Sequence, residues 1–206
     1  RSSERVAESC RRLYDRLREK TQRTNEEEWI LRLAAEYPEG DVGLFSFFLL
    51  NIYRLEPGQA IFVGDNVLHA YLEGELLECM TNSDNVVRGG LTNKRCDTNT
   101  LLEMLDFARG EPSLVSPVAS ASPGFVSFSV PAAEFCLERL DVQDQTLECA
   151  CAGRVQIVFC LSGRCELSSR EVRYELAEGD AFLIPAAVQN YTLACGRGLV
   201  FRVTVP

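Results

Sequence analysis

Two similar segments lie far apart in this chain, and each leads into a strand-like apolar run. They are LEPGQAIFV at residues 55–63 and LAEGDAFLI at residues 176–184. Their aligned pairs are Gly58 and Gly179, Ala60 and Ala181, Val67 and Val188, and His69 and Asn190. Internal similarity of this kind indicates two copies of one structural unit, here a small β-barrel.

Short apolar runs separated by turn residues fill most of the chain after residue 43, which is typical of β-sandwiches and barrels. The predicted strands are 44–55, 59–63, 67–72, 76–80, 125–130, 134–140, 155–161, 171–176, 181–185, 189–193 and 199–205. The Pro- and Ser-rich segment 109–123 lacks periodicity and is interpreted as a connector. We therefore predict a mostly β fold.

Helical patterns dominate the first 37 residues. Apolar positions from Val6 to Leu17 recur on one helix face. Asn25 with Glu28 has the spacing of a capping box, and the second helix should end before Pro38. A third, short helix is predicted at residues 100–107, capped by Asp97 or Thr98.

The composition narrows the function classes. A net charge of −9 argues against nucleic-acid and anionic-membrane partners, which need clustered Lys and Arg. No apolar run reaches the roughly 20 residues that span a bilayer, and the N-terminus lacks the apolar core of a signal peptide. The chain does not begin with Met, which we interpret as a fragment or a processed product.

Nine cysteines are present, without any C-x-x-C pair. Most lie in apolar runs, for example Cys136, Cys160 and Cys195, where Cys packs as a small hydrophobe. We therefore expect reduced thiols and a cytoplasmic protein. The alternative is a zinc site of four thiolates, which would use Cys149, Cys151, Cys160 and Cys165.

Residues 65–94 concentrate the side chains that can carry chemistry, including the only histidine, His69. In a strand at 67–72, His69 and Tyr71 would share one face. A turn at residues 73–75 would bring Glu78 beside one of them. A lone His is usually packed or solvated, but a buried His, Tyr and Glu group costs free energy unless a ligand or metal satisfies it.

Three further charged residues follow in the segment SDNVVRGGLTNK. By default Asp84 is a turn former, and Arg88 and Lys94 are solvated. Arg88, however, precedes Gly89-Gly90, where the backbone permits close approach of another group. Arg suits bidentate contact with phosphate or carboxylate, and an acid beside it suits proton transfer on an anionic substrate.

The blocks LEPGQAIF, LHAYLEG and SDNVVRGGLTNK, followed by TLLEML, resemble type I phosphomannose isomerases, zinc enzymes of the cupin superfamily. The resemblance is sharpest over about residues 40–107. It implies cupin-type (jelly-roll) barrels and interconversion of mannose 6-phosphate and fructose 6-phosphate. By position it implies His69 as a zinc ligand, Arg88 and Asp84 as catalytic residues, and Tyr71, Glu78 and Lys94 as substrate-binding residues.

The family's other zinc ligands, a Gln, a His and a Glu, precede the part matched here, and this chain has no second His. We therefore expect the C-terminal portion of an isomerase that is inactive alone, since zinc sites need three or four protein ligands. The expected parts are the end of a helical domain (1–38), part of a catalytic barrel (39–108), the connector (109–123) and a metal-free barrel (124–206). The alternatives are a non-catalytic sugar-phosphate-binding module and an inactive product.

Overall fold

The computed structural model describes residues 2–83, 85–107, 110–170 and 172–206. The chain forms two compact units. The first contains residues 1–55, 64–70 and 84–109, and the second contains residues 56–63, 71–83 and 110–206. Among the described residues, none of the helices has both the length and the apolar character needed to cross a bilayer.

Helices α1 (Ser2–Arg18) and α2 (Asn25–Ala34) confirm the two predicted helices. Cys10 and Leu17 of the predicted face of α1 are buried, and Ile30 of α2 is fully buried. The capping box is one residue earlier than predicted: Thr24 is the cap, and its backbone N–H donates to Glu27 at 3.1 Å. Glu27 also accepts from Lys20 at 2.6 Å, which favours the earlier register.

The predicted strand at 44–55 is wrong. Residues Val42–Phe48 form a 3-10 helix, η1, and no regular structure follows as far as residue 59. Asp41 caps η1 by accepting from the Gly43 N–H at 2.7 Å. Leu44 and Phe47, three residues apart, are buried, whereas Leu49 is 83% exposed. A short apolar run fits a buried strand or a helix equally well. Here the Asp41 cap stabilises the helix.

Only one of the other strands predicted before residue 100 forms. Strand β1 (Ala60–Phe62) pairs antiparallel with β2 (Ser113–Val115), Ile61 lying opposite Leu114. Residues 67–72 and 76–80, both predicted as strands, have no regular secondary structure. Isolated strands are unstable without paired neighbours, and the described residues supply none for these two segments. Helix α3 (Thr98–Met104) confirms the short predicted helix and its Asp97 cap, but it begins two residues and ends three residues earlier than predicted.

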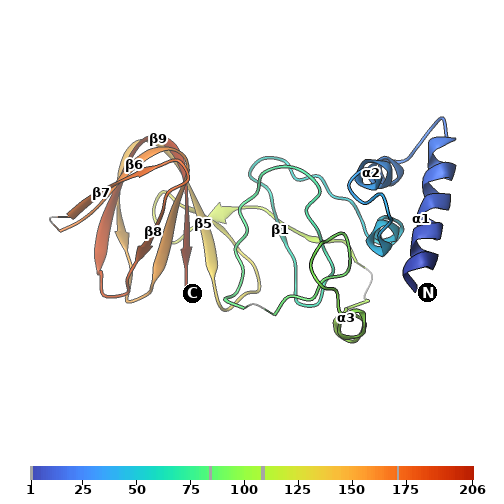
Figure 1. Cartoon of the computed structure of the whole chain (residues 1–206). Coiled ribbons are helices and arrows are strands. Elements are labelled where there is room, and N and C mark those ends of the chain that lie inside the picture. The colour runs from blue at the N-terminus through green and yellow to red at the C-terminus, as the bar shows by residue number, and fades with distance from the viewer. Residues whose placement is uncertain (1, 84, 108–109, 171) are drawn as a thin grey trace. The chain divides into compact units, whose positions relative to one another are not determined.

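The C-terminal strands form one seven-stranded antiparallel sheet that curls around its own core (Figure 1). The strands are β3 (Val118–Ala119), β4 (Val126–Phe128), β5 (Cys136–Ala150), β6 (Gln156–Ser169), β7 (Val172–Ala177), β8 (Ala181–Ile184) and β9 (Asn190–Thr204). The order is β3-β4-β5-β9-β6-β7, with β8 also paired to β6. The two predicted strands at 189–193 and 199–205 are one continuous strand, β9. Strands β2 and β3 lie within the predicted connector.

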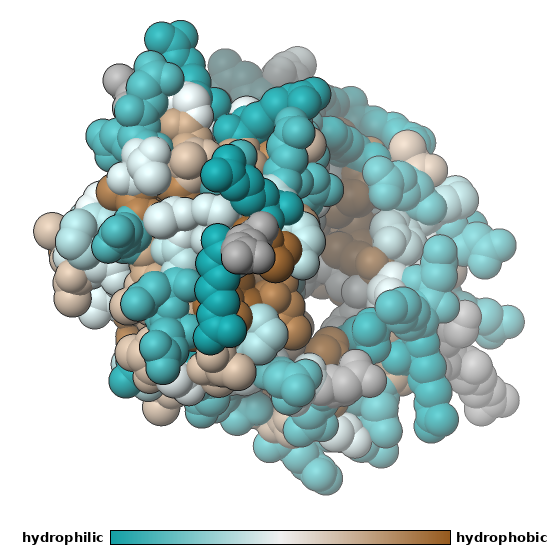
Figure 2. Space-filling model, turned by 90° about the vertical axis from the view of Figure 1, so that its left-hand side faces the viewer, coloured by the Kyte–Doolittle hydropathy of each residue, from teal (hydrophilic) through white to brown (hydrophobic). Residues whose placement is uncertain are grey.

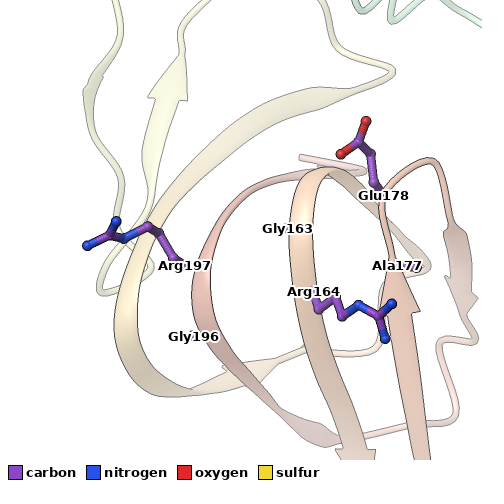
Figure 3. A pocket seen from close by; sticks show the side chains of 6 residues that line it. All are labelled: Gly163, Arg164, Ala177, Glu178, Gly196 and Arg197. Atoms are coloured by element: carbon purple, nitrogen blue, oxygen red, sulfur yellow. The ribbon is translucent and has the colours of Figure 1, made fainter.

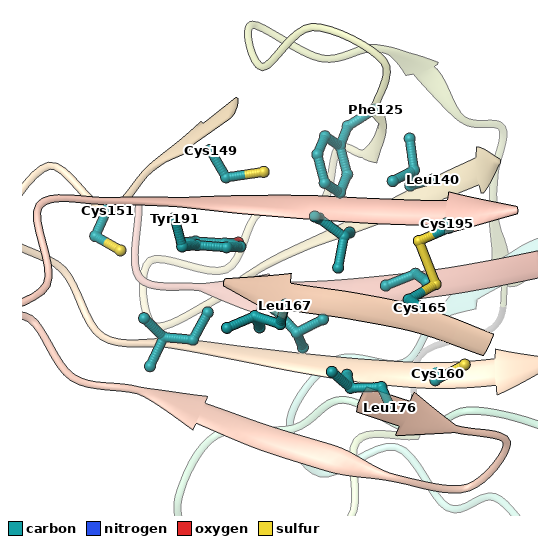
Figure 4. Close-up of a cluster of buried hydrophobic side chains, with 14 residues drawn as sticks. Phe125, Leu140, Cys149, Cys151, Cys160, Cys165, Leu167, Leu176, Tyr191 and Cys195 are labelled. Carbon is teal, nitrogen blue, oxygen red and sulfur yellow. A yellow bond between two sulfur atoms is a disulfide. The ribbon is translucent and has the colours of Figure 1, made fainter. Parts of the chain in front are cut away.

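The core of this barrel is built from aliphatic side chains and an unusual number of cysteines (Figure 4). Leu140, Leu176 and Val200 are almost completely buried. Five cysteines share this core: Cys149, Cys151, Cys160, Cys165 and Cys195. Burial raises the pKa of the Cys160 thiol, which keeps it protonated and consistent with a packing role.

The expectation that all thiols are reduced is wrong for two of the nine cysteines. Cys165 on β6 and Cys195 on β9 form a disulfide, and the other seven are free. The two residues lie directly opposite each other in the β6–β9 register. The sequence could not reveal this pairing, because it depends on which strands become neighbours. The disulfide also removes Cys165 from the four-thiolate zinc site considered above.

Candidate functional site

The predicted contact between Tyr71 and Glu78 is present. The Tyr71 hydroxyl donates to Glu78 Oε1 at 2.6 Å, and Gly74, with φ of +115°, lies in the turn between them. Partial removal from water, together with the Glu78 carboxylate, raises the pKa of Tyr71 to about 12. Tyr71 is therefore protonated at neutral pH, and its one hydroxyl proton is engaged by Glu78.

His69 lies in the first unit, and its side chain is exposed. Its Nδ1 lies 2.9 Å from the carbonyl oxygen of Val67. The neutral tautomer with its proton on Nδ1 donates to that carbonyl and carries its lone pair on Nε2. A backbone contact of this kind is how metal-binding histidines are commonly oriented.

The loop that contains Arg88 packs against the segment that contains His69, within the first unit. A Cβ atom on Gly89 would lie 3.2 Å from the side chain of Leu68, so only glycine fits there without displacement of a neighbour. Arg88 directly precedes Gly89 in the chain, and His69 directly follows Leu68. Arg88 itself is half-buried.

Asp41 holds the same loop and was missed by sequence reasoning. Its Oδ1 accepts the N–H of Leu91 at 3.0 Å as well as that of Gly43. Gly90, with φ of +138°, leaves no room for a side chain next to Asp41. The only sequence signal was an Asp before a Val-Gly pair, which is a weak capping pattern.

The contact observed for Lys94 is local to its own loop. Lys94 is exposed, and its backbone N–H donates to Thr92 Oγ1 at 3.2 Å. Asp84 lies outside the described residues. Within the described part of the chain, no group of three or more His, Cys, Asp or Glu side chains could hold a metal ion. His69 alone does not make a zinc site, so these residues do not fit zinc by themselves.

A pocket of about 670 Å³ lies elsewhere, in the C-terminal barrel, and is lined by Gly163, Arg164, Ala177, Glu178, Gly196 and Arg197. Arg164 and Arg197 point away from one another (Figure 3), and Arg164 donates to Glu175 at 2.7 Å. The arrangement is therefore not a convergent anion site.

Hydrophobic side chains also reach the surface between hydrophilic ones (Figure 2). Leu183, for example, is 65% exposed.

Comparison with known proteins confirms the resemblance noted in the sequence. Residues 126–205 match the family model described as "Mannose-6-phosphate isomerase, cupin domain". This match falls on the second barrel, where the resemblance had been less distinct. A probable mannose-6-phosphate isomerase of Dictyostelium discoideum is 34% identical over 191 residues, which are 88% of this chain and 42% of the relative.

Solved structures give the same result. A zinc-bound mannose 6-phosphate isomerase is 32% identical with a TM-score of 0.77, over 97% of this chain and 50% of that one. A point mutant of phosphomannose isomerase from Salmonella typhimurium is 32% identical, with a TM-score of 0.78. The mostly β, cupin-type fold with an N-terminal helical segment is thereby confirmed. The chain spans about half the length of the relatives that it matches.

Proposed function

We propose that this chain is the C-terminal portion of a zinc-dependent, cytoplasmic isomerase that interconverts mannose 6-phosphate and fructose 6-phosphate. The observation that carries the proposal is the extent of the similarity, which reaches 97% of the chain against a zinc-bound mannose 6-phosphate isomerase. The seven free cysteines favour a reducing compartment, whereas the Cys165–Cys195 disulfide favours an oxidising one, and the proposal follows the larger number. A sugar phosphate is the proposed partner, with no nucleic acid or membrane.

In this proposal the chain's own residues bind the substrate and move its proton. Arg88, beside the glycines of its loop, pairs with an oxyanion of the substrate, and Lys94 offers a point charge to the phosphate. The Tyr71 hydroxyl donates its one proton to Glu78, and its oxygen accepts a hydrogen bond from a sugar hydroxyl. Asp84 is the candidate for carrying the proton between C1 and C2. His69 is this chain's one proposed zinc ligand, and the other ligands must come from a longer chain.

The test replaces Arg88 in a longer protein that includes the upstream ligands. Arg88→Ala should lower kcat/KM by about a hundredfold or more, with an unchanged melting temperature. Arg164→Ala is the matched control, because Arg164 is an exposed arginine of the C-terminal barrel. Wild-type kcat/KM in the Arg88 variant would remove that residue from the mechanism.

A non-catalytic sugar-phosphate-binding module is the second candidate, favoured by the lack of a complete metal site in the described residues. Titration calorimetry of the 206-residue chain with mannose 6-phosphate separates the two. Binding without turnover, in this chain and in the longer protein alike, supports the module. Turnover in the longer protein supports the isomerase. The 206-residue chain should retain no stoichiometric zinc after dialysis; one tightly held zinc per chain contradicts this.

A further inference from the structure

Strand β7 (Val172–Ala177) forms one edge of the C-terminal sheet. Among the described residues it pairs with β6 and with no other strand, from Val172 opposite Ser169 to Ala177 opposite Arg164. In Figure 1 it lies at the margin of the barrel. The side of β7 that faces away from β6 is therefore available to a further strand.

The first face of β7 is apolar and only partly covered. Val172, Tyr174 and Leu176 alternate on the face that leads into the core, because Tyr174 lies opposite the buried Leu167. Leu176 is fully buried, but Val172 and Tyr174 are 49% and 48% exposed. The ring of Tyr174 packs against that of Phe182, with centroids 5.1 Å apart. The apolar face of β7 thus extends beyond the cover that the barrel provides.

The second face of β7 carries one exposed charge of each sign. The side chains of Arg173 and Glu175 are 75% and 65% exposed. Each pairs with a residue of β6: Glu175 accepts from Arg164 at 2.7 Å, and Arg173 lies 3.6 Å from Glu166. Both pairs lie at the surface and contribute little to stability. Charges on an edge strand normally prevent association, but opposite charges on one strand can also complement each other between two copies.

Charge selects one antiparallel register for two copies of β7. Around a two-fold axis, residues that lie opposite each other come from the same face of the strand. With Tyr174 opposite its own copy, Arg173 lies opposite Glu175 in both directions, and Val172 lies opposite Leu176. The next register on either side places Arg173 opposite Arg173, or Glu175 opposite Glu175. Opposite charges across a strand pair are stabilising and like charges are destabilising, so the first register is favoured.

We propose that β7 is the interface of a homodimer, in which two copies of this chain join their β7 edges in this register to form one continuous sheet. The proposal is independent of the isomerase function. A second copy is the favoured occupant because the charge pattern of β7 complements itself. One face of the junction covers Val172 and Tyr174, and the other joins Arg173 to Glu175 twice. A single strand edge buries little area, so the association should be weak and dependent on concentration.

Sedimentation equilibrium of the 206-residue chain at increasing concentration measures this association. All samples carry Cys96→Ser, because this exposed thiol could link two chains covalently. The mass should rise from 23.0 kDa toward twice that value. Hydrogen exchange of the backbone amides of residues 172–176 should slow as the dimer forms, because these amides become protected in the joined sheet.

Exchange of the two charges tests the register. Arg173→Glu and Glu175→Arg should each weaken self-association by about tenfold or more, because each places like charges opposite one another. Mixed in equal amounts, the two variants should associate with each other like the parent, since each supplies the charge that the other lacks. The variant with both substitutions should also dimerise like the parent. Arg154→Glu, at an exposed arginine before β6, is the control with the same change of charge and should match the parent.

Each other result decides against the proposal. A chain that stays monomeric at every concentration overturns it, whether the edge stays open or binds a strand of another protein. A dimer without slower exchange at residues 172–176 has its interface elsewhere. Parent-like association of both single variants, or no recovery on mixing them, excludes the register. If a single variant unfolds, the variant with both substitutions still decides, because only this register predicts that it dimerises.

Discussion

The turns before β1 and β8 have the same local structure, although they lie in different surroundings. Gly58 and Gly179 both have φ of +87°. In the first turn the Glu56 N–H donates to the side chain of Gln59 at 2.9 Å. In the second the Ala177 N–H donates to the side chain of Asp180 at 2.8 Å. The aligned sequences therefore specify the same turn twice.

Beyond the turns the two copies differ completely. The second copy enters a sheet in which β8 pairs with β6 and β9 pairs with β5 and β6, and its Leu176 is fully buried. In the first copy, as far as the structure describes the chain, β1 pairs with β2 alone, and the equivalent Leu55 is 37% exposed. The turn is specified locally, whereas the barrel requires partner strands. The second copy has these partner strands among the described residues, and the first copy has β2 alone.

The sharpest functional difference between the copies is His69 against Asn190, and exchanging it should have the largest effect. In the longer protein His69→Asn should lower kcat/KM by about a thousandfold and release the metal, because an amide is a poor zinc ligand. Steady-state kinetics and metal analysis after dialysis measure both changes. Asn190→Ala is the control and should keep parent activity. Retained metal and activity in His69→Asn would remove His69 from the ligand set.

The disulfide distinguishes the copies in stability, since the Cys165–Cys195 loop encloses the whole second copy. The two cysteines are 30 positions apart in the sequence, so loop-closure entropy predicts that opening the disulfide lowers the free energy of unfolding by about 3–4 kcal/mol. Urea unfolding of the 206-residue chain with and without reductant measures this. Cys165→Ala with Cys195→Ala should be insensitive to reductant. Alkylation of both thiols without prior reduction would contradict the bond itself.

The sequence predicted what short-range interactions determine. These parts include α1, the Asp97 cap of α3 and the turns at Gly58 and Gly179. It failed at residues 42–48, where a single Asp41 cap turns an apolar run into a 3-10 helix. It also failed at residues 67–80, where strand formation depends on partners distant in sequence. The alternation of apolar residues indicates which secondary structure a segment can adopt, but it does not indicate which strand the segment will pair with.

The contacts of the candidate site likewise divide into those within one short segment and those between segments distant in sequence. The contact of Tyr71 with Glu78 was predictable because one turn joins them. The packing of Gly89 on Leu68 and the anchoring of Leu91 by Asp41 were not, because both join segments distant in sequence. The specific roles of His69, Arg88 and Lys94 in an isomerase came from the resemblance and remain predictions.

Burial of the aligned leucines gives a third way to test the comparison. Leu176→Ala should lower the free energy of unfolding by about 3 kcal/mol, because a fully buried leucine leaves a cavity. Leu55→Ala should cost about 1 kcal/mol or less, since that side chain is already partly in water. Urea unfolding of the 206-residue chain checks both. Equal losses would mean that the first copy has a packed core like that of the second.

The aligned glycines should show the smallest effect and the most specific one. Any L-residue at φ of +87° costs about 1–2 kcal/mol, so Gly58→Ala and Gly179→Ala share this loss of stability. Gly179 has open space around an added Cβ, whereas at Gly58 that atom would meet Arg139 Nη1 at 2.7 Å. Gly58→Ala should therefore be the more destabilising of the two. In an Arg139→Ala background the two losses should become equal. If the difference between the glycines persists there, the contact with Arg139 is not its cause, and the two turns differ for a reason other than the guanidinium.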